Sequence, residues 1–90
     1  MELVETLEIR HKTGLHARPS TEFVRLAQRF RSEVKVAPPG GEEVDGKSII
    51  AVLSLGVPPM GRIVVRVTGD DAPEAMAALV DLVRRGFSSG

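Results

Sequence analysis

Apolar and polar residues alternate in four short stretches of the chain, which is the period of a strand with one buried face. The stretches cover residues 3–9, 33–38, 43–45 and 62–69. Gly40-Gly41 predicts a turn that joins the second and third stretches as a hairpin. The apolar positions that define these faces are Leu3, Leu7, Ile9, Val34, Val36, Ile63, Val65 and Val67.

Three other stretches have the spacing of helices. The first carries an apolar stripe at i, i+3, i+4 and i+7, formed by Phe23, Leu26, Ala27 and Phe30. A short helix follows a capping Ser48 and stops at Gly56; it is apolar almost all round, so we expect it to pack tightly on a neighbour. In the last helix Asp71 and Glu74 predict a capping box around Pro73. Its buried side is predicted to be Ala72, Ala75, Met76, Leu79, Leu82 and Val83.

The element order is therefore β-α-β-β-α-β-α in one domain, residues 1–90. Each strand has one apolar face, and three helices are available to cover it. This predicts a two-layer α+β sandwich whose sheet is antiparallel and solvated on its other face. The order of the strands in the sheet does not follow from these patterns.

Composition narrows the class of protein. The chain is 42% hydrophobic and 27% charged, as in ordinary globular domains, and it has no cysteine for a disulfide or a thiolate metal site. No apolar run approaches the roughly 20 residues that span a bilayer. The first ten residues alternate acidic and apolar side chains, unlike a signal peptide. We therefore expect a cytoplasmic protein with no membrane insertion.

The net charge of zero conceals an uneven distribution. Between residues 10 and 31, six basic residues face the single acid Glu22, a net of +5, so the remaining chain carries −5. Such a segment attracts a phosphate or an acidic protein surface. The alternative is a solvated helix face balanced by acids that are distant in sequence. The basic residues are Arg10, Lys12, Arg18, Arg25, Arg29 and Arg31.

The stretch TGLHARPST, residues 13–21, holds the candidate chemistry. Gly14 permits an unusual backbone shape, and Pro19 suits a first helical turn. His16 is thereby placed at or beside the helix N-cap, with the N–H groups of Ala17 and Arg18 directed toward its ring. A helix N-terminus favours anions and an uncharged imidazole, which is a nucleophile. With the guanidinium of Arg18 to hold oxygens, the stretch suits a histidine that accepts a phosphoryl group.

Spacing alone does not establish this role, because a single histidine beside an arginine at a helix start is ordinarily a surface residue. The other histidine, His11, follows a strand and is expected to face solvent. Nothing in the sequence supplies a hydrolytic base or a metal cluster, so we expect neither a metal nor a cofactor.

The motif GLHARPS resembles the active-site signature of the histidine-containing phosphocarrier proteins (HPr) of the bacterial sugar phosphotransferase system. KSIIAVLSLG, from Lys47, and the helix start GDDAPEAM resemble the same family, so the likeness covers the whole chain. It implies an open-faced β-sandwich with four antiparallel strands and three helices on one side. It also implies a monomeric phosphocarrier rather than an enzyme.

In such a phosphocarrier His16 takes a phosphoryl group on Nδ1 from phosphorylated enzyme I and passes it to a sugar-specific enzyme IIA domain. The resemblance assigns Arg18 to steadying the phosphoryl group, and the backbone N–H groups of Ala17 and Arg18 to contacting it. Thr13 stands where the family often has Asn or Ser, so we expect a small polar capping role there. Partner docking is assigned to Thr13, Ser20, Arg25, Lys47, Ile49 and Ile50.

Several of these residues have a structural alternative. Ile49 and Ile50 fit the core as well as a docking patch, and we expect one of them to be core. Lys47 could instead balance Asp45. Ser48 is predicted to be an N-cap. In HPr proteins of many Gram-positive bacteria the matching serine is phosphorylated by an HPr kinase, which connects the carrier to a catabolite-control regulator.

Three other functions stay open. A nucleic-acid module would explain the basic segment, but such modules stack bases on aromatic side chains, and this chain has three Phe and no Tyr or Trp. A small phosphatase of acylphosphatase size would release free phosphate from His16. A paralogue of HPr would serve a regulatory or nitrogen-linked phosphorelay. The sequence does not decide which acceptor is used.

Overall fold

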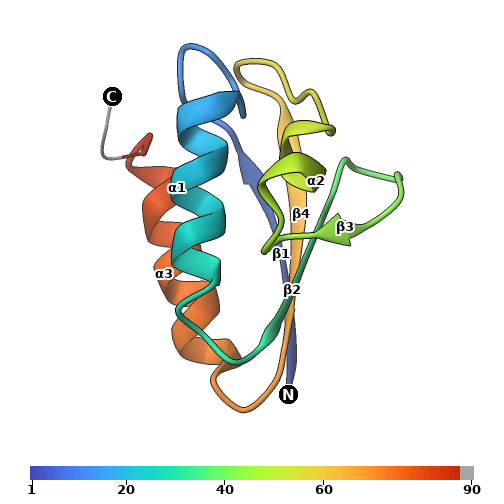
Figure 1. Cartoon of the computed structure of the whole chain (residues 1–90), viewed down its shortest axis with the longest axis vertical. Helices are drawn as coiled ribbons and strands as arrows, with labels where there is room; N and C mark the ends of the chain where they lie inside the picture. Colours follow the sequence, from blue (N-terminus) through green and yellow to red (C-terminus); the bar gives the residue numbers. More distant parts are fainter. Residues whose placement is uncertain (88–90) are drawn as a thin grey trace.

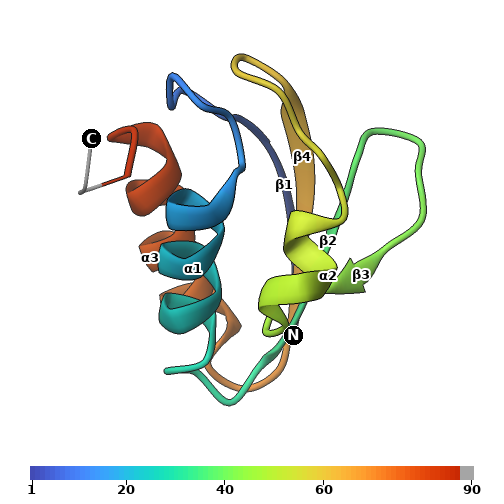
Figure 2. The same cartoon turned by 45° about the horizontal axis from the view of Figure 1, so that its top comes forward.

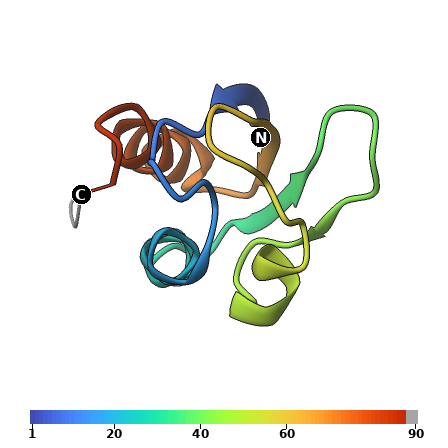
Figure 3. The same ribbon diagram turned by 90° about the horizontal axis from the view of Figure 1, so that it is seen from above.

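The computed structural model describes residues 1–87 and contains a four-stranded sheet with three helices on one face (Figure 1). This confirms the predicted open-faced two-layer architecture. The view from above shows α1, α2 and α3 on the same side of the strands (Figure 3). The elements are β1 (Glu2–Glu8), α1 (Ala17–Ala27), β2 (Glu33–Ala37), β3 (Val44–Asp45), α2 (Ile49–Leu53), β4 (Arg62–Thr68) and α3 (Ala72–Arg84).

The strands lie in the order β1-β4-β2-β3, and every neighbouring pair is antiparallel. β4 is therefore an inner strand that bonds to β1 on one side and β2 on the other. Thr68 marks this position, since it lies opposite both Glu2 of β1 and Glu33 of β2. The predicted hairpin of β2 and β3 is confirmed, although β3 has two residues and begins at Val44.

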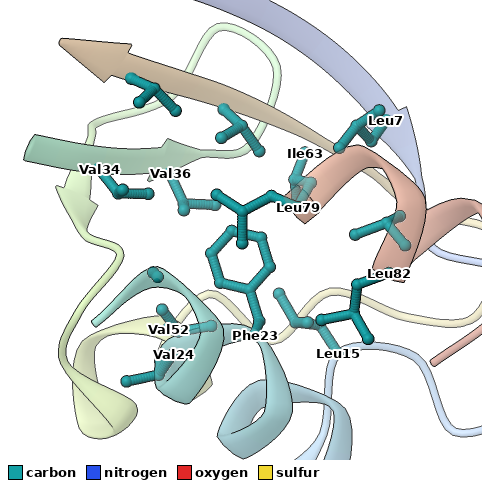
Figure 4. Packing of buried hydrophobic residues seen from close by; sticks show 14 of the residues in the cluster. Leu7, Leu15, Phe23, Val24, Val34, Val36, Val52, Ile63, Leu79 and Leu82 are labelled. Carbon is teal, nitrogen blue, oxygen red and sulfur yellow. The ribbon is translucent and has the colours of Figure 1, made fainter. Parts of the chain in front are cut away.

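The core fills the space between the sheet and the helices (Figure 4). Phe23 of α1 is completely buried and points toward the sheet, where it meets side chains from β2, β4 and α3. Burying a side chain of this size contributes roughly 1.5–3 kcal/mol. The predicted apolar face of β4 is confirmed, and all six residues predicted for the buried side of α3 are buried.

Two helices differ from the sequence prediction. α1 ends at Ala27, and Phe30 lies in the following turn, where it is only partly buried against the core. α2 packs on a neighbour, α1, as predicted, but through one side only, because Val52 alone of its five residues is buried. α2 lies at the side of the helical layer, as Figure 2 shows, and so has one covered side.

The predicted capping box at the start of α3 is also wrong. Asp71 occupies the N-cap position but makes no side-chain bond to its own helix. Its carboxylate accepts hydrogen bonds from the backbone N–H groups of Arg31 (2.8 Å) and Ser32 (2.9 Å), and from the Ser32 hydroxyl. These hydrogen bonds lower the pKa of Asp71, and the bond from the Ser32 hydroxyl has the largest effect. Asp71 thus ties the loop after α1 to the start of α3.

The open face of the sheet carries ion pairs and no helix. The Arg66 guanidinium lies 2.7 Å from the Glu43 carboxylate and 2.8 Å from that of Glu2, and these acids raise the pKa of Arg66. Arg66 of β4 thus pairs with Glu2 of β1 and with Glu43, the residue before β3. Within residues 1–87 there is no helix both long and apolar enough to cross a bilayer.

Candidate functional site

The loop that leads from β1 into α1 is held against the loop that precedes β4; both lie at the upper end of the view in Figure 1. Gly14 has φ +69°, and a Cβ there would lie 2.3 Å from the Val57 carbonyl oxygen. Only glycine combines this conformation with so close an approach. The next residue, Leu15, is buried, and its N–H donates to the Val57 carbonyl at 2.9 Å. The backbone immediately before His16 is therefore fixed.

His16 is the N-cap of α1, as the sequence predicted. Its side chain is exposed, and its Nδ1 accepts a hydrogen bond from the Ala17 N–H at 2.9 Å. A nitrogen that accepts this bond carries a lone pair, so the ring proton is on Nε2. Pro19 is the third helical residue, where a missing N–H removes no helical bond. The Nδ1 lone pair thus lies at the N-terminus of the helix.

The surroundings of His16 favour an anion. The first turn of α1 contains no acidic residue, so the partial positive charge of the helix N-terminus is uncompensated there. Arg18 is exposed and takes part in no ion pair with any of residues 1–87. An open depression of about 540 Å³ covers this end of the helix. It is lined by His11, Lys12, Thr13, His16, Ala17, Arg18 and Pro19.

Two residues predicted to dock partners, Thr13 and Ser20, form hydrogen bonds within the loop before α1 and its first turn. Ser20 is fully buried and its hydroxyl donates to the Leu15 carbonyl at 3.0 Å, so the prediction that it docks a partner is wrong. Thr13 is exposed but does not cap the helix. Its hydroxyl lies 2.7 Å from Nδ1 of His11, and the capping position belongs to His16.

His11 itself corrects the sequence prediction. It was expected to face solvent, yet it is only 8% exposed, and its ring packs edge-on against Phe87 with centroids 6.1 Å apart. It also lines the depression over His16. Sequence reasoning missed it because its aromatic partner lies at the opposite end of the chain.

Of the residues at the start of α2, two are exposed on the surface and two form hydrogen bonds that stabilise the fold. The expectation that Ile49 or Ile50 belongs to the core is wrong, because they are 37% and 81% exposed. The Ser48 cap is confirmed, with the Ala51 N–H donating to its hydroxyl at 3.3 Å. The Lys47 ammonium donates to the Phe30 carbonyl at 2.7 Å, which gives it a structural role between α1 and α2.

The basic segment is exposed along α1. Arg25 and Arg29 are on the surface, and none of the ion pairs that the described part of the chain forms includes either of them. Among residues 1–87, therefore, no acid forms an ion pair with Arg25 or Arg29. Residues 1–87 also contain no group of three or more His, Asp or Glu side chains placed to hold a metal ion.

Known proteins share both this fold and this site. The family described as "PTS HPr component phosphorylation site" matches residues 3–85. The chain is 38% identical to phosphocarrier protein NPr of Escherichia coli over 97% of each sequence, and 40% identical to phosphocarrier protein HPr of Neisseria meningitidis over 98% of each. It superposes on the crystal structure of HPr-C-His from Thermoanaerobacter tengcongensis with a TM-score of 0.89 and 42% identity, over 94% of both chains. The chain belongs to the HPr family of phosphocarrier proteins of the phosphotransferase system.

Proposed function

We propose that this protein carries a phosphoryl group on Nδ1 of His16, receiving it from phosphorylated enzyme I and passing it to an enzyme IIA domain. The observation that supports this most directly is the position of Nδ1 at the start of α1, where it accepts the Ala17 N–H at 2.9 Å. The nucleophilic lone pair is on the exposed ring, and the helix N-terminus stabilises an anion at the same place. We expect the protein to act as a monomer in the cytoplasm.

The transfer needs no group beyond those of the two proteins. The Nδ1 lone pair forms a bond to phosphorus while the bond from phosphorus to the donor breaks, and that electron pair stays on the donor. The ring, which already carries a proton on Nε2, can then release this proton to solvent because the side chain is exposed. Transfer to the acceptor reverses these changes.

Ala17 and Arg18 stabilise the charge that moves in this reaction. When phosphorus bonds to Nδ1, the Ala17 N–H loses its acceptor and becomes free to donate to a phosphoryl oxygen. The Arg18 guanidinium lines the same depression and offers paired donors that suit two oxygens of one phosphoryl group. The Arg18 side chain is near the site before the group arrives, and the Ala17 N–H is released to it as Nδ1 bonds phosphorus, so both can stabilise charge that develops during transfer.

We assign partner docking to a surface formed by α1 and α2, defined by Arg18, Arg25, Ile49 and Ile50. Two exposed isoleucines, beside a helix whose Arg18 and Arg25 form no ion pair with any of residues 1–87, suit a partner with an acidic rim and an apolar centre. Ile50→Ser should raise the KM for enzyme I with little loss of stability, because this side chain is 81% exposed. An unchanged KM, measured over a range of salt concentrations, would exclude Ile50 from the interface.

Phosphorylation of Ser48 by an HPr kinase would act on the same surface. Ser48 lies directly before Ile49 and Ile50 and already caps α2, so a phosphate at its hydroxyl would be compatible with the helix. Its roughly two negative charges would repel an acidic partner. A catabolite-control regulator would then bind the modified form.

A second candidate function is a nitrogen-linked or other regulatory phosphorelay. The 38% identity to NPr over nearly the whole chain favours it as much as the similarity to HPr favours sugar transport. The two candidates share the chemistry at His16 and differ in the acceptor. Comparing transfer from the phosphorylated protein to a sugar-specific IIA domain and to a regulatory IIA domain separates them.

The deciding experiment is incubation with enzyme I and phosphoenolpyruvate, followed by mass measurement. We expect one added phosphoryl group that is labile in acid, and none in His16→Ala. His11→Asn is the matched control, since it removes the second histidine and should still be labelled. The phosphorylated protein should persist until a IIA domain is added. Labelling of His16→Ala, or steady release of free phosphate without an acceptor, would contradict the proposal.

A further inference from the structure

His11 is built into the turn that precedes the reactive histidine. Its Nδ1 lies 3.2 Å from the Thr13 N–H and 2.7 Å from the Thr13 hydroxyl. A side-chain acceptor that bonds the N–H two residues later is the arrangement of an Asx turn, here made by an imidazole. The Gly14 N–H donates to the His11 carbonyl at 2.9 Å and closes the same turn. His11 therefore holds the turn of residues 11–14 twice, through its ring nitrogen and through its backbone carbonyl.

The other side of the His11 ring faces the end of α3. Phe87 meets it edge to face, with an interplanar angle of 79°. Phe87 is placed there by a Schellman motif: its N–H donates to the Leu82 carbonyl at 3.0 Å, and the N–H of Gly86 (φ +74°) donates to that of Val83 at 3.1 Å. Phe87 also has φ +63°, which a residue with a side chain adopts only when its surroundings hold it.

The remaining ring nitrogen shows which property of His11 the turn requires. Because Nδ1 accepts from a backbone N–H, the proton is on Nε2, and Nε2 is buried with no hydrogen-bond partner among residues 1–87. A phenylalanine would pack against Phe87 without stranding a donor, but it could not accept the Thr13 N–H. An asparagine could accept that bond without the ring. The acceptor and the ring can thus be removed separately.

We infer that His11 is a positioning residue for His16: it clamps the turn of residues 11–14 between Thr13 and Phe87, and so fixes where the acceptor ring stands. The inference rests on the proposed function, since it concerns the same site. The bond from the Leu15 N–H to the Val57 carbonyl holds the backbone directly before His16. His11 holds the turn that precedes Leu15, on the other side of Gly14. Without the His11 acceptor the turn can change shape, and the direction from which the chain enters α1 can then change with it.

The test compares three variants with the wild type. His11→Phe keeps a ring but no acceptor, and His11→Asn keeps the acceptor. Leu3→Ala is the control, because Leu3 packs on the core near the start of β1, whereas the loop to His16 follows the other end of that strand. Two readouts are measured: kcat and KM for phosphorylation by enzyme I, and the NMR signals of the His16 ring nitrogens and the Ala17 amide, which need no partner protein.

We expect His11→Phe to lower kcat about tenfold with KM nearly unchanged, since a shift of about 1 Å can cost up to 100-fold. The Ala17 and His16 signals should move in the same variant. His11→Asn keeps the bond to Thr13 and loses the ring against Phe87, so its kcat should fall less than that of His11→Phe. Leu3→Ala should lose stability without changing kcat or these signals. If His11→Phe does not fold, Thr13→Val, which removes only the 2.7 Å hydroxyl contact, should show the same changes to a smaller degree.

Unchanged kcat and unchanged NMR signals in His11→Phe would overturn the inference. Equal loss of kcat in His11→Phe and Leu3→Ala would also overturn it, since His11 would then act through stability alone. Failure of enzyme I to phosphorylate the wild type would refute the proposed function instead. In that case displaced Ala17 and His16 signals in His11→Phe would still support the positioning role, and unmoved signals would remove it.

Discussion

Gly14→Ala tests how closely the backbone before His16 is held against the loop that precedes β4. Two costs add in this variant. A left-handed residue with a Cβ is disfavoured by roughly 1–2 kcal/mol. The new Cβ would also lie 2.3 Å from the Val57 carbonyl oxygen and 2.8 Å from the Pro59 nitrogen, and backbone atoms cannot rotate away. Overpacking of this kind costs about 1–3 kcal/mol.

The expected loss for Gly14→Ala is therefore roughly 2–5 kcal/mol, a large part of the ~5–15 kcal/mol that stabilises a domain. Gly40→Ala is the matched control, because Gly40 has a similar φ of +74° and a Cβ there would meet nothing within 4 Å. Urea unfolding of both variants separates the two costs: Gly40→Ala should lose only the conformational part. The folded fraction of Gly14→Ala should also be phosphorylated more slowly, since the loop must move to relieve the clash.

Equal losses of stability in Gly14→Ala and Gly40→Ala would refute this account, because the close approach to Val57 would then have no energetic consequence. So would a Gly14→Ala protein that is destabilised as expected but whose His16 is phosphorylated at the rate of the wild type. That result would mean that the position of the loop does not control the acceptor.

Three further predictions concern single side chains. Arg18→Ala should slow phosphoryl transfer markedly while Arg18→Lys recovers part of the rate, because lysine lacks the paired donors; equal rates in stopped-flow transfer assays would show that Arg18 takes no part. Ser48→Asp should slow phosphorylation of His16 at unchanged thermal stability, and Ser48→Ala should lose about 0.5–2 kcal/mol in urea unfolding as a lost cap with nearly normal transfer. Asp71→Asn should be less stable than the wild type above the unfolded pKa of about 3.9. Because the folded pKa of Asp71 is lowered, that difference should shrink as the pH falls through it, and a difference independent of pH would contradict the assignment.

The one-sided elements of this fold could be predicted from the sequence. Val65 and Val67 alternate with half-exposed or exposed neighbours because β4 is covered on one face only. This burial of every second residue is visible in the sequence as alternating apolar and polar positions. Phe23 marked the buried stripe of α1 for the same reason. His16 at the N-cap followed from local rules, since Gly14 and Pro19 constrain the backbone within five residues of it. These features depend on neighbours in the sequence.

The errors concern residues whose partners are distant. Asp71 matched a capping box, but its carboxylate is occupied by Ser32, which is 39 residues away. The sequence shows His11 only as a polar residue at a strand end, and the position of Phe87 buries it. Apolarity makes Ile50 a candidate for the core, but it does not reveal that a five-residue helix at the side of a layer has one covered face. Tertiary contacts override local preference at each of these positions.

The inner position of β4 has a consequence for the order in which the chain folds. Both β1 and β2 pair with β4, yet β4 begins only at Arg62. Until that strand emerges from the ribosome, the first 61 residues can form helix α1 and the hairpin of β2 and β3, while β1 has no strand to join. Closing the sheet then requires contacts between distant residues, such as Glu2 and Thr68, which are 66 positions apart. Such long-range pairing slows folding relative to helical proteins of the same size, and it leaves the apolar face of β1 unprotected during most of synthesis.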